Sequence, residues 1–301
     1  MFRNYAEMRA RAAEMGPVPV SVAAADDKGV IGAVRIAMDL GMIRPILVGE
    51  EKKIRALLEE EGISGELQVV DSPDAPSSAL AAVERVRRGE ARVLVKGQVN
   101  TSDFMRAVLD KNVGLRTGRL VSGFAVFEIP GEKKLVFQAD GGVNVAPRLA
   151  EKREILLDAL AAMARFGIER PKVAVLTANE QVNPKMPATV DAAELVRMSR
   201  EEGFPPCVVE GPIAMDVALD PEMARRKGLH SEVAGDVDLY IMPNIESGNI
   251  MGKLLVHYMK AKMAGIVLGV SAPVVLTSRG ESSEGKVNSI ALACLASKEL
   301  A

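Results

Sequence analysis

The chain has few of the residues that build disulfide frameworks, metal sites or charge relays. Its 301 residues include two cysteines, Cys207 and Cys294, and two histidines, His230 and His257. Two distant thiols predict no disulfide framework, and the absence of a CxxC pair argues against a zinc site. So few, isolated histidines also argue against a Ser-His-Asp hydrolase. We therefore expect no metal and a reducing, cytoplasmic location.

Charge of one sign and long apolar runs are missing as well. The 38 basic and 40 acidic residues give a formal net charge of −2, which provides no reason to expect a nucleic-acid partner or an anionic membrane surface. The longest apolar runs, such as 267–270 and 274–276, have the size of strands and are far too short to span a membrane. The first 15 residues mix Glu with Arg in a helical pattern, which predicts a surface helix and neither a secretion signal nor a transit peptide.

Several common nucleotide and hydrolase motifs are absent. The chain has no GxGxxG after a strand, no GxxxxGK[ST] and no GxSxG. Dinucleotide binding of the usual kind, P-loop hydrolysis and a nucleophile elbow therefore lose support. Asp140, Asp236 and Asp238 could form a carboxylate metal site, but their spacing is unspecific.

Short β-branched runs alternate with segments of helical periodicity along the chain. This alternation predicts an α/β fold with mostly parallel sheets that are flanked by helices on both faces. Residues 120–127 and 134–137, joined by Ile-Pro-Gly-Glu, predict an antiparallel hairpin inserted into that scheme. The other expected strands are 18–23, 45–48, 67–70, 92–95, 172–176, 207–209, 238–242, 265–268 and 274–277. The expected helices are 29–40, 52–60, 75–87, 102–109, 148–166, 189–202, 221–226, 247–262 and 283–298.

The length predicts two domains. The alternation restarts after the hairpin, near residues 140–142, so we place a domain boundary there. The last strand and helix can return to the first domain, because the termini of a domain often lie close together. This gives a first α/β domain of residues 1–140 plus 272–301, a second of residues 141–271, and a hinged cleft between them.

Polar residues follow several of the predicted strands, where ligands bind in open α/β sheets. After the strand at 92–95 come Asn100, Thr101 and Ser102, and Arg106 lies one turn into the next helix. Thr101 or Ser102 can cap that helix, whose free N–H groups would attract an anion, and a guanidinium suits phosphate. The alternative is an ordinary helix cap with a surface arginine.

The strand at 274–277 ends in the same way. Ser278 and Arg279 follow it, and Ser282 or Ser283 can cap the final helix. That helix has one apolar stripe and therefore buries one face, with Cys294 as a small core residue. Residues 138–144 and 243–249 form two more polar strand ends, although each could be turn chemistry alone. Together the four strand ends favour an anionic ligand.

These segments resemble the phosphate acetyltransferase/phosphate butyryltransferase family. The resemblance covers essentially the whole chain. It is carried by VLVKGQVNTSDFMRAVLDK (93–111), VSGFAVFEIP (121–130), ANEQVNPKMPATVDA (178–192), EVAGDVDLYIMP (232–243), PNIESGNIMGK (243–253) and AGIVLGVSAPVVLTSRGESSEGKVNSIALACL (264–295). It implies two α/β domains of the isocitrate/isopropylmalate dehydrogenase-like architecture, with the active site in the cleft. It also implies acyl transfer between coenzyme A and phosphate, no cofactor besides these substrates, and a homodimer or larger homo-oligomer.

The resemblance also assigns roles to residues. Ser278 and Arg279 match the family's Ser-Arg pair near the reacting thioester and phosphate. Arg106 matches its other phosphate-binding arginine, following the turn at Asn100 and Thr101. The cleft residues that match by position are Ser122, Asp140 and Asn144.

One departure bears on the substrate. Acetyl-specific members carry an aspartate seven residues after the serine as the proposed base for the coenzyme A thiol, and here that position is Gly285. Butyryl-type members also lack this aspartate, so we expect short, butyryl-like acyl chains, with acetyl as the alternative. The base stays open. Glu281 and Glu284 are nearby, but each could be only an acid favoured by the helix dipole.

Three further expectations follow. Phosphate attacks the thioester directly in a ternary complex, so no covalent acyl-enzyme is needed. A kinase that consumes the acyl phosphate is the implied metabolic partner. Two other classes compete with the transferase: a metal-dependent hydroxyacid dehydrogenase of the same architecture, and a non-catalytic acyl-CoA-binding module.

Overall fold

The computed structural model describes residues 1–277 and 281–298, which form two compact units. The terminal unit comprises Phe2–Arg119 and Ala264–Ala301, and the middle unit comprises Leu120–Met263 together with Met1. These boundaries lie earlier in the chain than the expected 140 and 271, so the predicted hairpin lies in the middle unit. Residues 1–277 and 281–298 contain no helix with the length and hydropathy of a membrane span.

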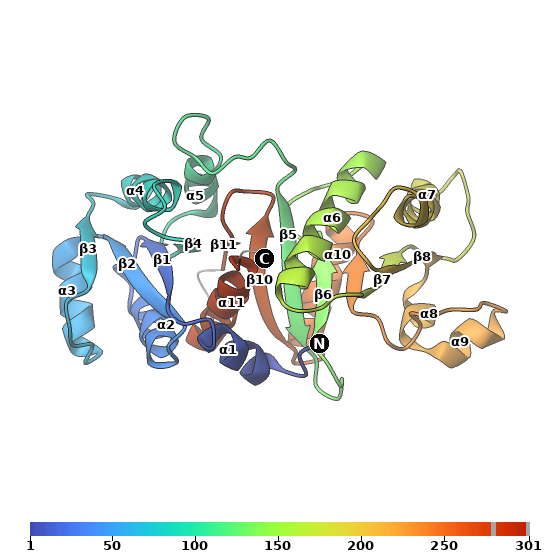
Figure 1. The fold of residues 1–301 in the computed structure, drawn as a ribbon, viewed down its shortest axis with the longest axis horizontal. Coiled ribbons are helices and arrows are strands. Elements are labelled where there is room, and N and C mark those ends of the chain that lie inside the picture. Colours follow the sequence, from blue (N-terminus) through green and yellow to red (C-terminus); the bar gives the residue numbers. More distant parts are fainter. Residues whose placement is uncertain (278–280, 299–301) are drawn as a thin grey trace. The chain divides into compact units, whose positions relative to one another are not determined.

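The terminal unit contains a mostly parallel sheet (Figure 1). Its strands are β1 (Val18–Ala23), β2 (Ile43–Gly49), β3 (Gln68–Asp71), β4 (Val93–Lys96), β10 (Lys262–Leu268) and β11 (Val274–Val275). Their order is β3-β2-β1-β4-β11-β10, and only the β10–β11 pair is antiparallel. Residues of β1 and β4 are buried on both faces, as expected of strands covered by helices. The carboxyl ends of β1, β4 and β11 therefore meet at one edge of the sheet.

Helices cover both faces of this sheet. α4 (Ala75–Arg87) packs on β1 and on α5 (Thr101–Val108), whereas α11 (Ser283–Ala296) packs on α1 (Tyr5–Ala13) and α2 (Lys28–Asp39). The remaining helix, α3 (Glu51–Glu60), packs on β2 and β3. Figure 1 shows α4 and α5 on one side of the strands and α1, α2 and α11 on the other. The first 15 residues thus contain a helix as predicted, α1, which buries Tyr5, Met8 and Ala12.

The middle unit contains five further strands. Its strands are β5 (Ser122–Glu128), β6 (Val136–Ala139), β7 (Lys172–Leu176), β8 (Val208–Ile213) and β9 (Leu239–Ile241), in the order β5-β6-β9-β7-β8. The β5–β6 pair is antiparallel, which confirms the predicted hairpin, and the other pairs are parallel. Its helices are α6 (Leu149–Arg165), α7 (Pro187–Glu201), α8 (Met215–Leu219), α9 (Pro221–Arg226) and α10 (Ile245–His257). The core includes Phe124, Phe137 and Phe166, whose ring centroids lie 5.5 to 6.2 Å apart.

The prediction of an α/β fold with mostly parallel sheets is confirmed, with three local corrections. The expected helix 247–262 ends at His257, because Lys262 already begins β10. The five-residue helix α8 was not predicted, since it is too short to show a period. The last helix was expected to bury one face, but all its residues from Gly285 to Ala296 are buried. A helix apolar on most sides is typical of the interior.

Candidate functional site

The turn that follows β4 is held against the end of β1. The N–H of Gly97 donates to the carbonyl of Ala23 at 2.8 Å, and the N–H of Gln98 donates to the carbonyl of Ala24 at 2.9 Å. A Cβ atom on Gly97 would lie 2.3 Å from both of these carbonyl oxygens. Glycine is therefore required here, because the backbones of the two strand ends are in direct contact.

The start of α5 brings three of the predicted residues together. The helix begins at Thr101 with Asn100 in the N-cap position, so the expectation that Thr101 or Ser102 would be the cap residue is wrong. A guanidinium N–H of Arg106 donates to Asp103 Oδ1 at 2.8 Å, and the amide Nδ2 of Asn100 donates to Asp103 Oδ2 at 3.3 Å. The Arg106 side chain is 75% exposed. Asp103 thus orients a solvent-facing guanidinium beside the helix N-terminus, an arrangement that suits an anion.

A buried lysine, which the sequence had placed only within a polar run, lies at the same edge of the sheet. Lys96 is 2% exposed, and its Nζ lies 3.4 Å from the carbonyl oxygens of Gly97 and Thr277. Lysine is rarely buried to this extent. Its ammonium group connects the turn after β4 to the chain that leaves β11. The sequence signal was its position directly after the predicted strand 92–95, at the start of the polar run that follows.

The beginning of α11 is fixed by a side-chain cap. The Ser282 hydroxyl accepts a hydrogen bond from the N–H of Gly285 at 3.1 Å, so Ser282 is the cap residue among the two predicted serines. The side chain of Lys286 donates to the carbonyl of Glu281. Ser278 and Arg279, the predicted catalytic pair, lie outside the described residues. The structure therefore describes the chain on both sides of this pair, up to Thr277 and from Glu281 onward.

In the middle unit, Asp140 organises the loop that follows β6. One carboxylate oxygen accepts from the N–H groups of Gly142 and Val143 at 2.8 and 3.0 Å. The other accepts from the N–H and the side-chain amide of Asn144 at 2.9 and 2.6 Å. Asn144 also donates to the carbonyl of Val121 at 2.9 Å. The structure thus brings Asp140 and Asn144 together, and Asp140, 2% exposed, uses both oxygens to shape the loop.

Ser122 lies beside this loop at the start of β5. Its side chain is 1% exposed, and the next residue, Gly123, leaves room for the aspartate. A Cβ atom on Gly123 would lie 2.8 Å from Asp140 Oδ1. The two neighbours of Ser122 in the chain, Val121 and Gly123, thus contact Asn144 and Asp140.

The two remaining polar strand ends, 138–144 and 243–249, meet each other. The side-chain amide of Gln138 donates to the carbonyl of Gly248 at 3.0 Å, and the N–H of Ile245 donates to the carbonyl of Val145 at 3.0 Å. Asn244 caps α10 by accepting from the N–H of Ser247 at 3.0 Å. The first turns of α10 thus support the loop that Asp140 organises.

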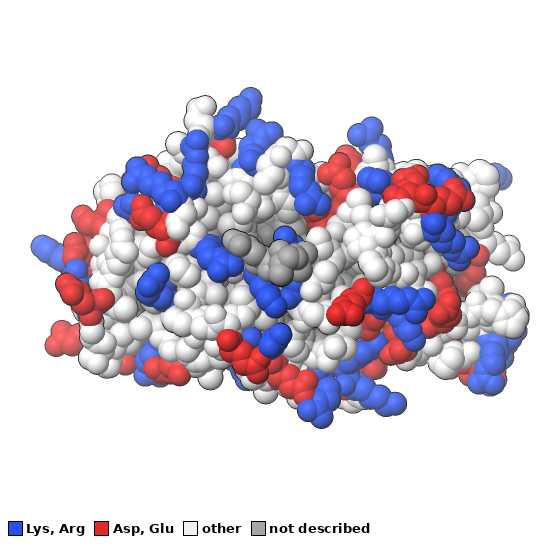
Figure 2. Space-filling model, in the orientation of Figure 1, with Lys and Arg blue, Asp and Glu red and all other residues white. Residues whose placement is uncertain are grey.

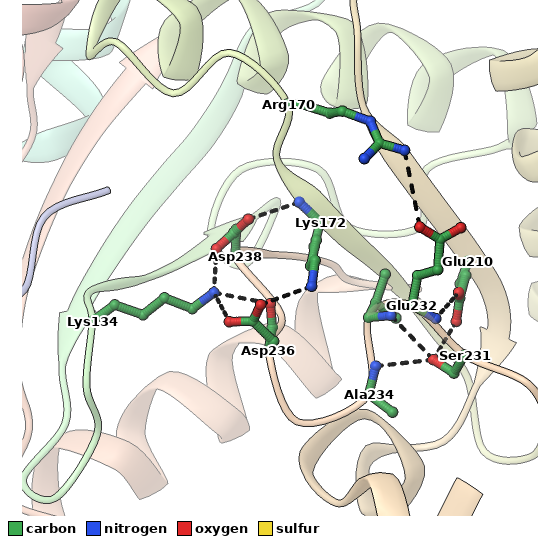
Figure 3. A network of polar contacts seen from close by, with 10 residues as sticks. Lys134, Arg170, Lys172, Glu210, Ser231, Glu232, Ala234, Asp236 and Asp238 are labelled. Atoms are coloured by element: carbon green, nitrogen blue, oxygen red, sulfur yellow. Dashed lines mark hydrogen bonds and ion pairs between the residues drawn. The ribbon is translucent and has the colours of Figure 1, made fainter.

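The hypothesis that Asp140, Asp236 and Asp238 form a metal site is wrong. Asp236 and Asp238 precede β9, whereas Asp140 follows the neighbouring parallel strand β6, so they lie at opposite edges of the sheet. Figure 3 shows both carboxylates paired with lysines. Lys134 Nζ lies 2.6 Å from Asp236 Oδ1 and also contacts Asp238, and Lys172 Nζ lies 2.8 Å from Asp236 Oδ2. The pKa of Asp236 is lowered by hydrogen bonds from Lys134 and then from Lys172.

This lysine–aspartate network continues along the strand starts. Asp238 accepts from the backbone N–H of Lys172 at 2.7 Å. Farther along, the hydroxyl of Ser231 donates to Glu210 Oε2 at 2.5 Å and accepts from the N–H of Ala234 at 2.9 Å (Figure 3). Apart from the local Ser231–Ala234 hydrogen bond, these contacts join segments distant in sequence, which is typical of a structural network. Across residues 1–277 and 281–298, no three His, Cys, Asp or Glu side chains are grouped so as to hold a metal ion.

The burial of Cys294 and the mixed charge of the surface agree with what the sequence predicted. Cys294 is fully buried, and burial raises the pKa of its thiol to about 12, so the prediction of a core residue is confirmed. Burial also raises the pKa of the half-buried Cys207. Figure 2 shows Lys and Arg side chains interspersed with Asp and Glu side chains over the visible face.

Comparison with protein families matches residues 74–294 to the family described as phosphate acetyl/butaryl transferase. The phosphate butyryltransferase of Clostridium acetobutylicum is 45% identical over 298 residues, which are 98% of this chain and 98% of that protein. The phosphate acetyltransferase of Thermotoga maritima is 41% identical over 277 residues, or 92% of this chain and 94% of that protein.

A solved structure agrees with these sequence relatives. The crystal structure of a branched-chain phosphotransacylase from Enterococcus faecalis V583 superimposes with a TM-score of 0.80 at 29% identity. The match covers 93% of this chain and 99% of that chain. The similarity therefore extends over nearly the whole chain in both sequence and fold.

Proposed function

Because the chain belongs to the phosphate acetyl/butyryl transferase family, we propose that it transfers a short acyl group between coenzyme A and inorganic phosphate. The observation that carries this proposal is the 45% identity to a phosphate butyryltransferase over 98% of both chains. The same match supports butyryl-like acyl chains, as does Gly285 in place of the acetyl branch's aspartate. Acetyl transfer is the second candidate, supported by the 41% identical acetyltransferase.

The proposed reaction is a direct attack of phosphate on the thioester carbonyl. Phosphate is already anionic at neutral pH, so it needs orientation more than activation. Arg106, held by Asp103, and the free N–H groups at the start of α5 are suited to that task. From the family resemblance we assign Arg279 to the phosphate and Ser278 to the sulfur or the oxyanion. Neither cysteine is activated, since the pKa of each thiol is raised, which supports transfer without an acyl-enzyme.

The loop that Asp140 organises has a supporting role in this proposal. The carboxylate of Asp140 accepts four hydrogen bonds within its own loop, so it shapes backbone for coenzyme A or phosphate and does not act as a base. Asn144 belongs to the same loop and donates to the carbonyl of Val121, the residue before Ser122. We propose no metal and no cofactor besides the two substrates.

A homodimer is part of the proposal, and α10 supplies the surface for a second copy of the chain. Gly248, Gly252 and Leu255 lie on the buried face of this helix. On its outer face, Ile250, Leu254 and Tyr258 are 64, 49 and 82% exposed. Large apolar residues thus face solvent while two glycines face the core, and an exposed apolar face of this kind suits a protein–protein interface.

Two further parts of the proposal concern the cell. Free thiols at Cys207 and Cys294 suit the cytoplasm, where coenzyme A chemistry would take place. An acyl phosphate is a reactive anhydride, so a kinase that transfers its phosphoryl group would consume the product.

The proposal is tested by following free-thiol release from acetyl-, propionyl-, butyryl- and isobutyryl-CoA, with and without phosphate and with EDTA throughout. Phosphate-dependent release is expected, fastest with a four-carbon substrate. Fastest release from acetyl-CoA would select the acetyl alternative. No release from folded protein that still binds coenzyme A would favour the non-catalytic module. Release that EDTA abolishes would contradict the metal-free reaction.

A further inference from the structure

The proposed reaction contains a proton transfer for which no residue has been assigned. In the direction that forms acyl-CoA, the coenzyme A thiol must lose its proton before sulfur attacks the acyl carbonyl. A thiol with a pKa of about 8.5 is mostly protonated at neutral pH. A carboxylate whose pKa is raised toward neutrality is an effective acceptor.

Two acids stand at the beginning of α11, and their environments differ. The Glu284 side chain is 50% exposed and lies 3.8 Å from a guanidinium nitrogen of Arg9. Glu281 is half-buried, and this burial raises the pKa of its carboxyl, although the positive charge of Lys286 and the N–H of Ser282 oppose the shift. Glu284 has the environment of a surface ion pair, whereas Glu281 has a half-buried carboxyl whose pKa is raised above its ordinary value by burial.

The carboxylate of Glu281 occupies space that only glycine at position 285 leaves open. A Cβ atom on Gly285 would lie 2.1 Å from Glu281 Oε1, 2.8 Å from Cδ and 3.0 Å from Cγ. Gly285 lies in the first turn of α11 and has no positive φ angle, so its backbone does not itself require glycine. Glycine weakens a helix relative to alanine. In this structure, the absence of a side chain at position 285 therefore leaves the space that the Glu281 carboxylate fills.

The backbone around this carboxylate is held from both sides. Lys286, 9% exposed, donates to the Glu281 carbonyl, and Ser282 caps the helix through the N–H of Gly285. Val287 and the following residues of α11 are buried, which fixes the helix in the terminal unit. Glu281 is also two residues after Arg279 in the chain, next to the residues assigned to the reaction.

We infer that Glu281, seated against Gly285, is the catalytic residue that accepts the proton of the coenzyme A thiol. This inference rests on the proposed transferase activity. The S–H bond breaks and its proton passes to the Glu281 carboxylate, while sulfur forms a bond to the acyl carbon. The bond between the acyl carbon and the phosphate oxygen then breaks, and its electron pair leaves with phosphate. The proton ends on the released phosphate, which departs as monohydrogen phosphate. In the reverse direction, protonated Glu281 donates to the departing thiolate.

The test is the pH profile of kcat/KM for coenzyme A with butyryl phosphate, measured between about pH 6 and 9. Glu281→Gln should lose roughly 10²- to 10⁴-fold near pH 7, the usual contribution of a general base. The loss should shrink toward about pH 8.5, where the thiol ionises without help. Glu284→Gln, the matched control in the first turn of α11, should keep the wild-type profile.

A structural role for Glu281 would produce a different result. Equal loss at every pH, or no loss, would overturn the inference while wild-type turnover left the transferase proposal intact. Absence of turnover in the wild-type protein would instead contradict the proposed function. Because the raised pKa means that burial disfavours the charged carboxylate, Glu281→Gln should not lower the melting temperature at pH 7.

The role of the glycine is tested separately. Gly285→Ala should displace the Glu281 carboxylate and reproduce the pH-dependent loss in a folded protein. In a Glu281→Ala background, where no carboxylate is left to displace, Gly285→Ala should add no further loss. Full activity of Gly285→Ala, or an added loss in the double variant, would contradict the proposed role of Gly285 in positioning the Glu281 carboxylate.

Discussion

The Cα atom of Gly141 lies 2.6 Å from the position that a Cβ atom on Gly248 would occupy. The carbonyl oxygen of Asp140 lies 3.2 Å from the same position. The second turn of α10 therefore packs directly on the backbone of the loop that Asp140 organises, with no side chain between them. A larger side chain on this face of α10 would therefore displace the backbone of the loop directly.

Gly248→Ala should displace that loop. The added methyl group meets backbone atoms that cannot rotate away, and overpacking of this kind costs about 1–3 kcal/mol. We expect a lower free energy of unfolding in urea and a higher KM for acyl-CoA. Gly252→Ala is the matched control, because its Cβ would lie 3.5 Å from the Phe127 ring, an ordinary contact. Equal stability of the two variants would contradict the close packing at Gly248.

Arg106→Ala should weaken the use of phosphate. Loss of a charged hydrogen-bond donor costs about 1.5–3 kcal/mol, or roughly 10- to 100-fold in kcat/KM for phosphate. Arg106→Lys should recover part of this loss, because it restores the charge without the planar fork. Arg55→Ala removes another exposed, ion-paired arginine of the terminal unit and should leave these kinetics unchanged. Normal phosphate kinetics in Arg106→Ala would remove this residue from the proposal.

A charge on the exposed face of α10 should separate the two copies. Leu254→Glu and Tyr258→Glu place carboxylates in the proposed apolar interface, where burial of an unpaired charge is costly. Light scattering of the size-exclusion peak should give twice the chain mass of 32.1 kDa for the wild type and the single chain mass for the variants. Leu80→Glu changes a leucine of α4 that is 44% exposed and should keep the larger mass. A wild type that is monomeric, or variants that keep the wild-type mass, would refute this interface.

Asp236 should contribute stability that is lost in acid. Lys134 and Lys172 hold the pKa of this carboxyl below its ordinary value of 3.8. Its contribution is therefore present above pH 3.8 and disappears as the pH falls through the lower folded-state pKa. The difference in unfolding free energy between wild type and Asp236→Asn should shrink over this range. It should stay below about 1 kcal/mol, since the pairs are largely exposed.

The control for this measurement is Asp39→Asn, which removes an exposed carboxylate near the end of α2. Its effect on the unfolding free energy should stay small at every pH. A difference for Asp236→Asn that grows as the pH falls would contradict the assigned sign.

Local patterns predicted most elements, because period and caps depend on neighbours in sequence. The strand at 18–23 and the helix at 75–87 have the predicted bounds. The end of α10 was missed, since the apolar residues after His257 continue a helical pattern although the chain turns into β10. The burial of α11 on all sides was also missed, because its neighbours α1 and α2 come from the other end of the chain.

The sequence by itself determined the fold class, the family and the residues that gather at strand ends, since these depend on composition, period and motif. Only tertiary structure decided how those residues are used. Asp140 became the organiser of its loop because four donors converge on it. Asp236 and Asp238 pair with lysines and lie far from Asp140, because the start of β9 and the end of the parallel strand β6 lie at opposite ends of the strands. Glu281 and Glu284 differ by three positions in sequence, and what distinguishes them is the burial of one carboxylate against Gly285 and the exposure of the other.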